Sequence, residues 1–225
     1  SSDLGAKGSV PSWMLSPSES LSDFKLLIFN TAKKETTNYY VHKHMMAVGA
    51  RGSEYMNKVF RSESTATTFQ MTLDGKTSVL VPKILNFIYC HDYDINITTE
   101  DAVPFRQLGK MLEIIPLEIE ASTFILKDMD NINHLSTYVS DCYYFKDKEI
   151  SKAVVEKCAT NIKKIPANDN LWAEMNPELF LQVVSSVHIE RNTLSNHLSI
   201  LIKMYLEIHQ NEIDVNLFLN GEKSI

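Results

Sequence analysis

The pattern of apolar and polar positions changes its period early in the chain. Residues 24–29 form a short, mostly apolar run that is typical of a buried strand, and residues 38–42 are again rich in β-forming side chains. The polar connection between these two runs predicts a hairpin. Residues 69–73 alternate apolar and polar side chains, which predicts a third, half-buried strand, and we expect a further short strand at residues 95–97.

Between the second and third predicted strands the period becomes helical. Residues 44–48 and 53–60 are typical of two short helices, separated around Gly49 and Gly52, with Ser53 as the N-cap of the second. From residue 80 onward, apolar residues recur at spacings of three and four almost throughout. The expected helical stripes lie at 81–88, 105–112, 117–125, 135–142, 154–162, 179–184 and 194–208.

The predicted architecture is therefore α+β, with a mixed unit of strands and helices first and an all-helical unit after it. Residues 1–20 are rich in serine, glycine and proline and predict a mobile leader, from which Trp13 and Met14 could dock on a neighbouring surface. We place the mixed domain at residues 21–130 and the helical domain at residues 131–225, because no strand pattern appears in the second range.

Composition and charge narrow the functional classes. Of the 225 residues, 44% are hydrophobic and 22% are charged, which is ordinary for a globular protein. The apolar runs fall far short of the roughly 20 residues that a membrane span needs, and the N-terminus lacks the pattern of a secretory signal. The net charge of −6 is divided evenly on either side of residue 130, so no basic face is indicated. We therefore expect neither a membrane nor a nucleic acid as a partner.

The number and spacing of the cysteines indicate the cellular compartment of the protein. Cys90, Cys142 and Cys158 are odd in number and show no CxxC spacing. This pattern fits reduced thiols better than a disulfide framework or a zinc site. We expect an intracellular protein, cytoplasmic or nuclear.

Motifs of catalysis are missing from the sequence. The seven glycines form neither a dinucleotide-binding loop nor a phosphate-binding loop, and no nucleophile elbow occurs. The sequence therefore predicts no enzymatic activity, no catalytic residue and no cofactor. A deep polar pocket that gathers several titratable groups would favour an enzyme instead.

Two histidines are the candidates for a metal site. His42 and His44 would share a face if both lay on a strand. A helix is expected to begin between them, however, and no third ligand is indicated. The favoured interpretation is a packed His42 at a strand end and an exposed His44. Cys90 and His91 are a weaker pair, because adjacent residues on a helix point apart, and we predict no metal.

The first unit resembles a BTB/POZ domain, a small mixed sheet flanked by helices. The resemblance covers residues 22–128 and rests on the order and spacing of several short motifs. These motifs are Ser22-Asp23, Val41-His42-Lys43, Ala47, Ser53-x-Tyr55, Val59-Phe60, Phe87-Ile88-Tyr89 and Asp92-Tyr93.

The second unit is similar to the helical BACK domain that follows BTB in many adaptor proteins. The resemblance spans residues 131 to about 210 and rests on the segments Leu135–Tyr144 and Pro177–Ser186. Asn131 and Ser151 are its candidate helix caps. In fuller relatives a recognition domain such as a Kelch propeller comes next, and we expect none within these 225 residues. The residues expected in the helical core are Leu179, Val183, Leu198 and Leu201.

The BTB resemblance implies a non-enzymatic protein-interaction adaptor that forms homodimers. Asp23 and Lys43 correspond to a charged pair near the dimer interface of the family, although a solvated surface pair is the simpler alternative. Met45 and Met46 are expected to add an exposed apolar pair to this interface. We also expect at least one methionine among Met45, Met46 and Met56 to be buried in the core.

A cullin scaffold of a ubiquitin ligase is the second partner that the resemblance suggests, with an unknown recruited protein as the third. Tyr55, Met56 and Phe60 are the candidate cullin contacts. Adaptors of this kind usually carry an apolar-x-Glu element a few residues later, but here Glu63 has Arg61 two residues before it. The alternative function is a self-associating structural or regulatory scaffold that has no connection with ubiquitin ligases.

Overall fold

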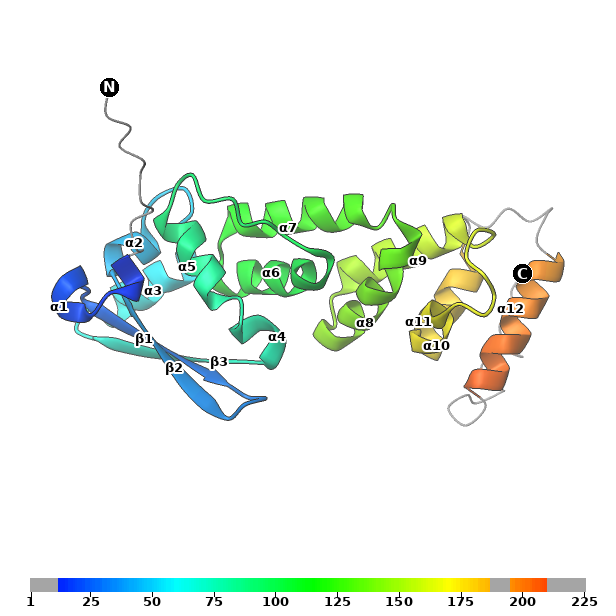
Figure 1. The fold of residues 1–225 in the computed structure, drawn as a ribbon, viewed down its shortest axis with the longest axis horizontal. Coiled ribbons are helices and arrows are strands. Elements are labelled where there is room, and N and C mark those ends of the chain that lie inside the picture. Colours follow the sequence, from blue (N-terminus) through cyan, green and yellow to red (C-terminus); the bar gives the residue numbers. More distant parts are fainter. Residues whose placement is uncertain (1–11, 187–194, 210–225) are drawn as a thin grey trace, which may run out of the picture. The chain divides into compact units, whose positions relative to one another are not determined.

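The computed structural model describes residues 12–186 and 195–209, and Figure 1 shows the fold. The chain divides into two compact units, Ser1–Phe124 and Ile125–Ile225, and the division falls inside α7, a little before the boundary predicted near residue 130. The elements are η1 (Ser12–Met14), α1 (Pro17–Ser20), β1 (Phe24–Asn30), β2 (Glu35–Val41), α2 (Lys43–Ala47), α3 (Glu54–Ser62), β3 (Thr68–Leu73), α4 (Gly75–Ser78), α5 (Val81–Tyr89), α6 (Thr99–Leu112), α7 (Ile115–Asp128), η2 (Ile132–His134), α8 (Leu135–Phe145), α9 (Lys148–Asn161), α10 (Asn170–Glu174), α11 (Pro177–Val184) and α12 (Ser195–Ile208).

The first unit is built on a three-stranded sheet with β1 in its centre (Figure 1). β1 and β2 form the predicted antiparallel hairpin, in which Phe24 lies opposite Val41. β3 runs parallel to β1 on its other side, and Leu26 lies opposite Phe69. Alternate residues of β1 are buried, as expected for a strand with one face on the core. The three predicted strands of the sheet are therefore confirmed.

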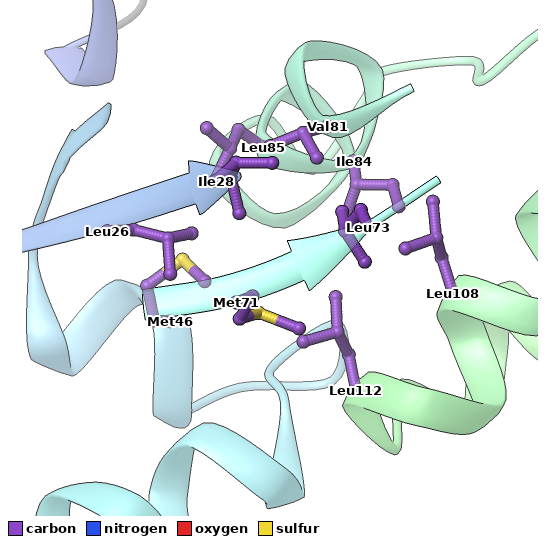
Figure 2. Close-up of a pocket in the computed structure, with 10 residues that line it drawn as sticks. All are labelled: Leu26, Ile28, Met46, Met71, Leu73, Val81, Ile84, Leu85, Leu108 and Leu112. Carbon is purple, nitrogen blue, oxygen red and sulfur yellow. The ribbon is translucent and has the colours of Figure 1, made fainter. Parts of the chain in front are cut away.

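One face of this sheet meets the helices in an apolar core. Figure 2 shows side chains of β1, β3, α5 and α6 converging there, together with Met46 of α2. The space that they leave is only about 20 Å³ and has no polar lining, so it is a packing void that stays dry and not a ligand site. The lining residues are Leu26, Ile28, Met46, Met71, Leu73, Val81, Ile84, Leu85, Leu108 and Leu112.

Of two local expectations for the first unit, one is confirmed and one is wrong. Ser53 is the N-cap of α3, because its hydroxyl accepts a hydrogen bond from the backbone N–H of Met56. The strand predicted at residues 95–97 is wrong, since this segment is irregular. Asn96 has a φ of +44°, which no extended strand allows, and its N–H donates to the carboxylate of Asp94. Ile95 is buried without being part of a sheet.

The predicted leader is too long. Trp13 is buried, its indole N–H donates to Oδ1 of Asn86 at 3.0 Å, and its ring lies 5.9 Å from that of Tyr39. A tryptophan held in this way does not belong to a free segment, so the leader prediction is wrong for residues 12–20, although the suggested docking of Trp13 is correct. Residues 1–11 lie outside the described part of the chain.

The second unit is helical wherever the structure describes it, which confirms the predicted fold class. Its core contains a row of aromatic rings. The ring of Phe180 stacks on Tyr205 with centroids 3.7 Å apart and meets Trp172 edge-on at 6.0 Å. The hydroxyl of Tyr205 donates to the carbonyl of Met175 at 2.8 Å, so α12 is joined to the end of α10 by packing and by a hydrogen bond.

The expected core residues of this unit are mostly confirmed. Leu179, Val183 and Leu201 are buried, but Leu198 is only half-buried, which corrects the prediction. The buried stripe of α12 is defined by Leu201 and Tyr205, four residues apart, and Leu198 lies at its edge.

One of the two predicted caps in this unit is correct. The side chain of Asn131 accepts from the N–H of Asn133 at the start of η2. Ser151 is not a cap: α9 begins at Lys148, and the carboxylate of Asp147 accepts from its first free N–H groups. None of the helices in the described ranges is long and apolar enough to cross a membrane.

Candidate interaction surface

The two predicted interface residues Asp23 and Lys43 meet at the start of α2. Oδ1 of the exposed Asp23 accepts a hydrogen bond of 2.8 Å from the backbone N–H of Lys43. The first N–H groups of a helix have no partner within it, so this carboxylate satisfies one of them and lies favourably at the positive end of the helix. Asp23 thus anchors α2 to the beginning of β1.

The side chain of Lys43 turns toward a different group. Its Nζ donates to the carbonyl of Ser64 at 3.2 Å and lies 5.4 Å from the ring of Phe24 and 5.7 Å from that of Phe60. The two rings meet edge to face, 4.8 Å apart. Asp23 and Lys43 are therefore neighbours, as predicted, but the contact between them runs through the backbone of Lys43.

His42 is held at both ring nitrogens. Nε2 lies 2.7 Å from the carbonyl oxygen of Ser20, and Nδ1 lies 3.1 Å from the hydroxyl of Tyr89. A carbonyl only accepts, so Nε2 carries the proton, and in a neutral ring Nδ1 accepts from Tyr89. Burial raises the pKa of Tyr89 to about 12, so its hydroxyl keeps its proton. This arrangement leaves neither nitrogen for a metal, and His44 is exposed as expected.

An exposed leucine lies beside this cluster. Leu21 is 80% exposed and has the left-handed backbone that ends α1, with a φ of +56°. It directly follows Ser20, whose carbonyl is bonded to His42, so it is held next to the start of α2. Leu21 is not predicted from the sequence, because α1 falls within the serine-rich segment that predicts a leader. Pro17 at the first position of a turn preceded by Ser16 was the available signal of a short helix.

The three methionines of α2 and α3 are not equally accessible. Met46 is 1% exposed and Met56 is fully buried, whereas Met45 is half-buried. The expected exposed pair is therefore wrong for Met46, and Met56 is not a surface contact. Met46 is buried because α2 is short and its one inward-facing position fills the core beneath the sheet (Figure 2).

The remaining candidate cullin contacts keep part of their surface. Tyr55 and Phe60 of α3 are half-buried, and the ring of Tyr55 lies 6.0 Å from that of Phe69. α3 ends at Ser62, and residues 61–65 after Phe60 are exposed and polar. This side of α3 therefore offers a partner two partly exposed aromatic rings, followed by a polar segment.

Comparison with known families fits this geometry. The model of the BTB/POZ domain matches residues 14–128, about half of the chain. The chain belongs to the BTB/POZ family. The match begins at the last residue of η1, directly after the buried Trp13, and it ends at the last residue of α7. No match to a curated protein was found.

Membership in the family gives a general function. BTB/POZ domains are protein-interaction domains, generally without enzymatic activity, and they commonly self-associate. In this BTB domain Asp23, Lys43, Met45 and the newly found Leu21 lie at or next to the start of α2. The BACK-like interpretation of the second unit, which lies beyond the match, stays a prediction.

Proposed function

We propose that this protein is a non-enzymatic adaptor that forms homodimers through its BTB domain and bridges a cullin-type ubiquitin ligase to a recruited protein. The match to the BTB/POZ family over residues 14–128 carries the proposal, because such domains commonly self-associate. The helical unit then acts as a BACK-like extension of the BTB domain. Its uninterrupted helices and buried apolar stripes support this role.

The proposed dimer surface consists of Leu21, Asp23, Lys43 and Met45. A single exposed leucine means little on a protein surface. Leu21, however, follows Ser20, which is bonded to His42, and the half-buried Met45 lies in α2, which begins directly after His42. A twofold axis would place each such surface against its own copy. A charged residue introduced here would therefore occur twice at the interface of the dimer.

Co-purification of two differently tagged copies of the full chain tests this surface. The double variant Leu21→Asp/Met45→Asp should lose most of the co-purified partner, because two further carboxylates per copy would lose their hydration against the apolar groups of the interface. Val79→Asp is the control, since Val79 is also an exposed apolar residue but follows α4. Loss of the co-purified partner in the control, or no loss in the double variant, would show that the interface lies elsewhere.

A self-associating scaffold without a ubiquitin connection is the second candidate, and one observation favours it. The segment from Arg61 to Thr65 is exposed and polar, so the apolar side chain usual before Glu63 in cullin adaptors is missing. An apolar anchor often supplies much of the energy of an interface.

A binding assay with a purified cullin N-terminal region distinguishes the two candidates. Under the adaptor proposal the wild type binds, and Arg61→Leu, which creates an apolar-x-Glu element, binds more tightly. Arg61→Gln is the control for loss of the arginine charge and of its hydrogen bond to Asn57. If neither the wild type nor Arg61→Leu binds the cullin region at micromolar concentration, the function as a scaffold is favoured.

A further inference from the structure

The helical unit contains a groove that the BTB function does not use. The groove has a volume of about 670 Å³, within the range of ligand sites, and is formed by the end of α8 and the beginnings of α9 and α11. These three helices belong to one unit and lie together in Figure 1. The lining residues are Cys142, Tyr143, Tyr144, Lys146, Lys148, Ser151, Lys152, Val155, Asn176, Glu178, Leu179 and Gln182.

Positive charge is concentrated in this groove. Lys146, Lys148 and Lys152 line it and are exposed, against the single acidic residue Glu178. None of the three lysines forms an ion pair with another residue in the described ranges. The surrounding sequence is acidic, with 9 basic and 12 acidic residues over 131–225. The lysines therefore create a local positive potential that their own unit does not neutralise.

The helix ends do not supply this charge. The first N–H groups of α9 are bonded to the carboxylate of Asp147, and an N–H in the first turn of α11 is bonded to the side chain of Asn176. These caps satisfy backbone donors that an anion would otherwise use. Recognition of an anion in the groove thus depends on the lysine side chains.

An aromatic and apolar surface accompanies the lysines. Tyr143 is 68% exposed at the end of α8, and Leu179 and Val155 lie on the adjacent helices. A ring that is exposed on a groove wall offers contact area at a low cost in conformational entropy.

The groove has no reactive nucleophile. Cys142 is buried, its thiol donates to the carbonyl of Val139, and burial raises the pKa of this thiol. The thiol is thus protonated and faces its own helix, so the groove has the composition of a binding site and not of a thiol-enzyme site.

We propose that this groove binds an acidic peptide segment of a partner protein, with carboxylates on Lys146, Lys148 and Lys152 and an apolar side chain of the peptide beside Tyr143. Protein is favoured over nucleic acid because the chain as a whole carries a net charge of −6, which repels a phosphate backbone beyond the groove. The inference is independent of dimerisation and of cullin binding, since every residue involved lies in the helical unit.

Fluorescence anisotropy on the full chain tests the proposal. The probe is a fluorescein-labelled peptide of alternating glutamate and leucine with one central tryptophan, and the same peptide with lysine in place of glutamate is the negative probe. Lys148→Glu/Lys152→Glu should weaken binding of the acidic probe about tenfold, because two attractions become repulsions. Lys148 lies in the first turn of α9, where glutamate is favourable, and Lys152 is exposed, so this variant is expected to fold.

The controls separate the groove from general charge. Lys33→Glu/Lys34→Glu changes the net charge by the same amount at two exposed lysines of the first unit and should leave binding unchanged. Tyr143→Ala should also weaken binding without any change of charge. Equal binding by the wild type and Lys148→Glu/Lys152→Glu would overturn the proposal. Absence of binding of the acidic probe, or preference for a labelled single-stranded oligonucleotide, would overturn it as well.

Discussion

Met45 and Met46 are adjacent residues with opposite positions in the BTB domain. Met46 fills the core beneath the sheet (Figure 2), whereas Met45 keeps part of its surface exposed. The two residues have identical side chains and lie on the same helix, so they differ only in the direction in which their side chains leave α2. Any test of the dimer surface must therefore change Met45 and leave Met46 intact.

The difference between these methionines is measurable as stability. Met46→Ala should lower the free energy of unfolding of the BTB domain by about 2–5 kcal/mol, the usual cost of emptying a core position, and Met45→Ala should cost less. The chain has two tryptophans, one in each unit, so a Trp172→Phe background leaves Trp13 as the reporter of the BTB domain in urea. Equal losses for the two variants would contradict the assignment of Met46 to the core.

The three thiols should differ in reactivity. Cys142 and Cys158 are buried, and burial raises the pKa of Cys158 to about 12 and that of Cys142 above its usual value. Near neutral pH, below these raised values, both remain protonated and react slowly, since the thiolate is the nucleophile. Cys90 is only half-buried.

A thiol reagent that forms a coloured product measures this difference. We expect one fast-reacting thiol in the folded protein and three in denaturant. Cys90→Ser should remove the fast phase, and persistence of that phase would show that the buried cysteines are accessible.

At the scale of elements, α12 depends on two side chains one helical turn apart. Leu201 and Tyr205 are buried, and Tyr205 stacks on Phe180 and donates to the carbonyl of Met175. α12 is also joined to the unit by His197, whose Nε2 lies 2.9 Å from the carbonyl oxygen of Ile162, but this stripe provides its buried apolar contacts. Leu198 contributes less because it lies at the edge of the stripe.

Truncation of these leucines tests the position of α12. Leu201→Ala should destabilise the helical unit by about 2–5 kcal/mol, and Leu198→Ala by clearly less. In a Trp13→Phe background the fluorescence of Trp172, which meets Phe180 edge-on, reports this unit alone. A larger loss for Leu198→Ala would restore the original prediction and contradict the burial of Leu201.

The elements predicted correctly from the sequence are those with strong local signals. The sheet strands follow from apolar runs and alternation, and the start of α3 from the capping preference of Ser53. The failures arise where distant contacts decide. Trp13 is held by Asn86, 73 residues away, and Ile95 is buried by its neighbours although Asn96 prevents a strand. No local pattern contains this information.

The candidate site was only partly accessible to sequence reasoning. Asp23 and Lys43 were identified through the family motif, and the structure places them in contact. Leu21 was missed, because its exposure depends on the left-handed end of α1 and on the bond between Ser20 and His42. The lysine groove was missed because Lys146, Lys148 and Lys152 line one groove with Glu178 only after α9 and α11 have packed together.

At the scale of the whole molecule, two units carry separate surfaces. The BTB domain presents the start of α2 with Leu21 and Met45, and the helical unit presents the lysine groove. An adaptor needs at least two such surfaces, one for assembly and one for a recruited partner. We thus assign self-association to the family-matched unit and peptide recognition to the other.

The mass of the full chain in solution tests the central claim, dimerisation, most directly. Multi-angle light scattering over a rising concentration series should give twice the chain mass of 25.6 kDa, because the proposed interface pairs identical surfaces. A mass that stays at that of one chain at the highest concentration would contradict the account.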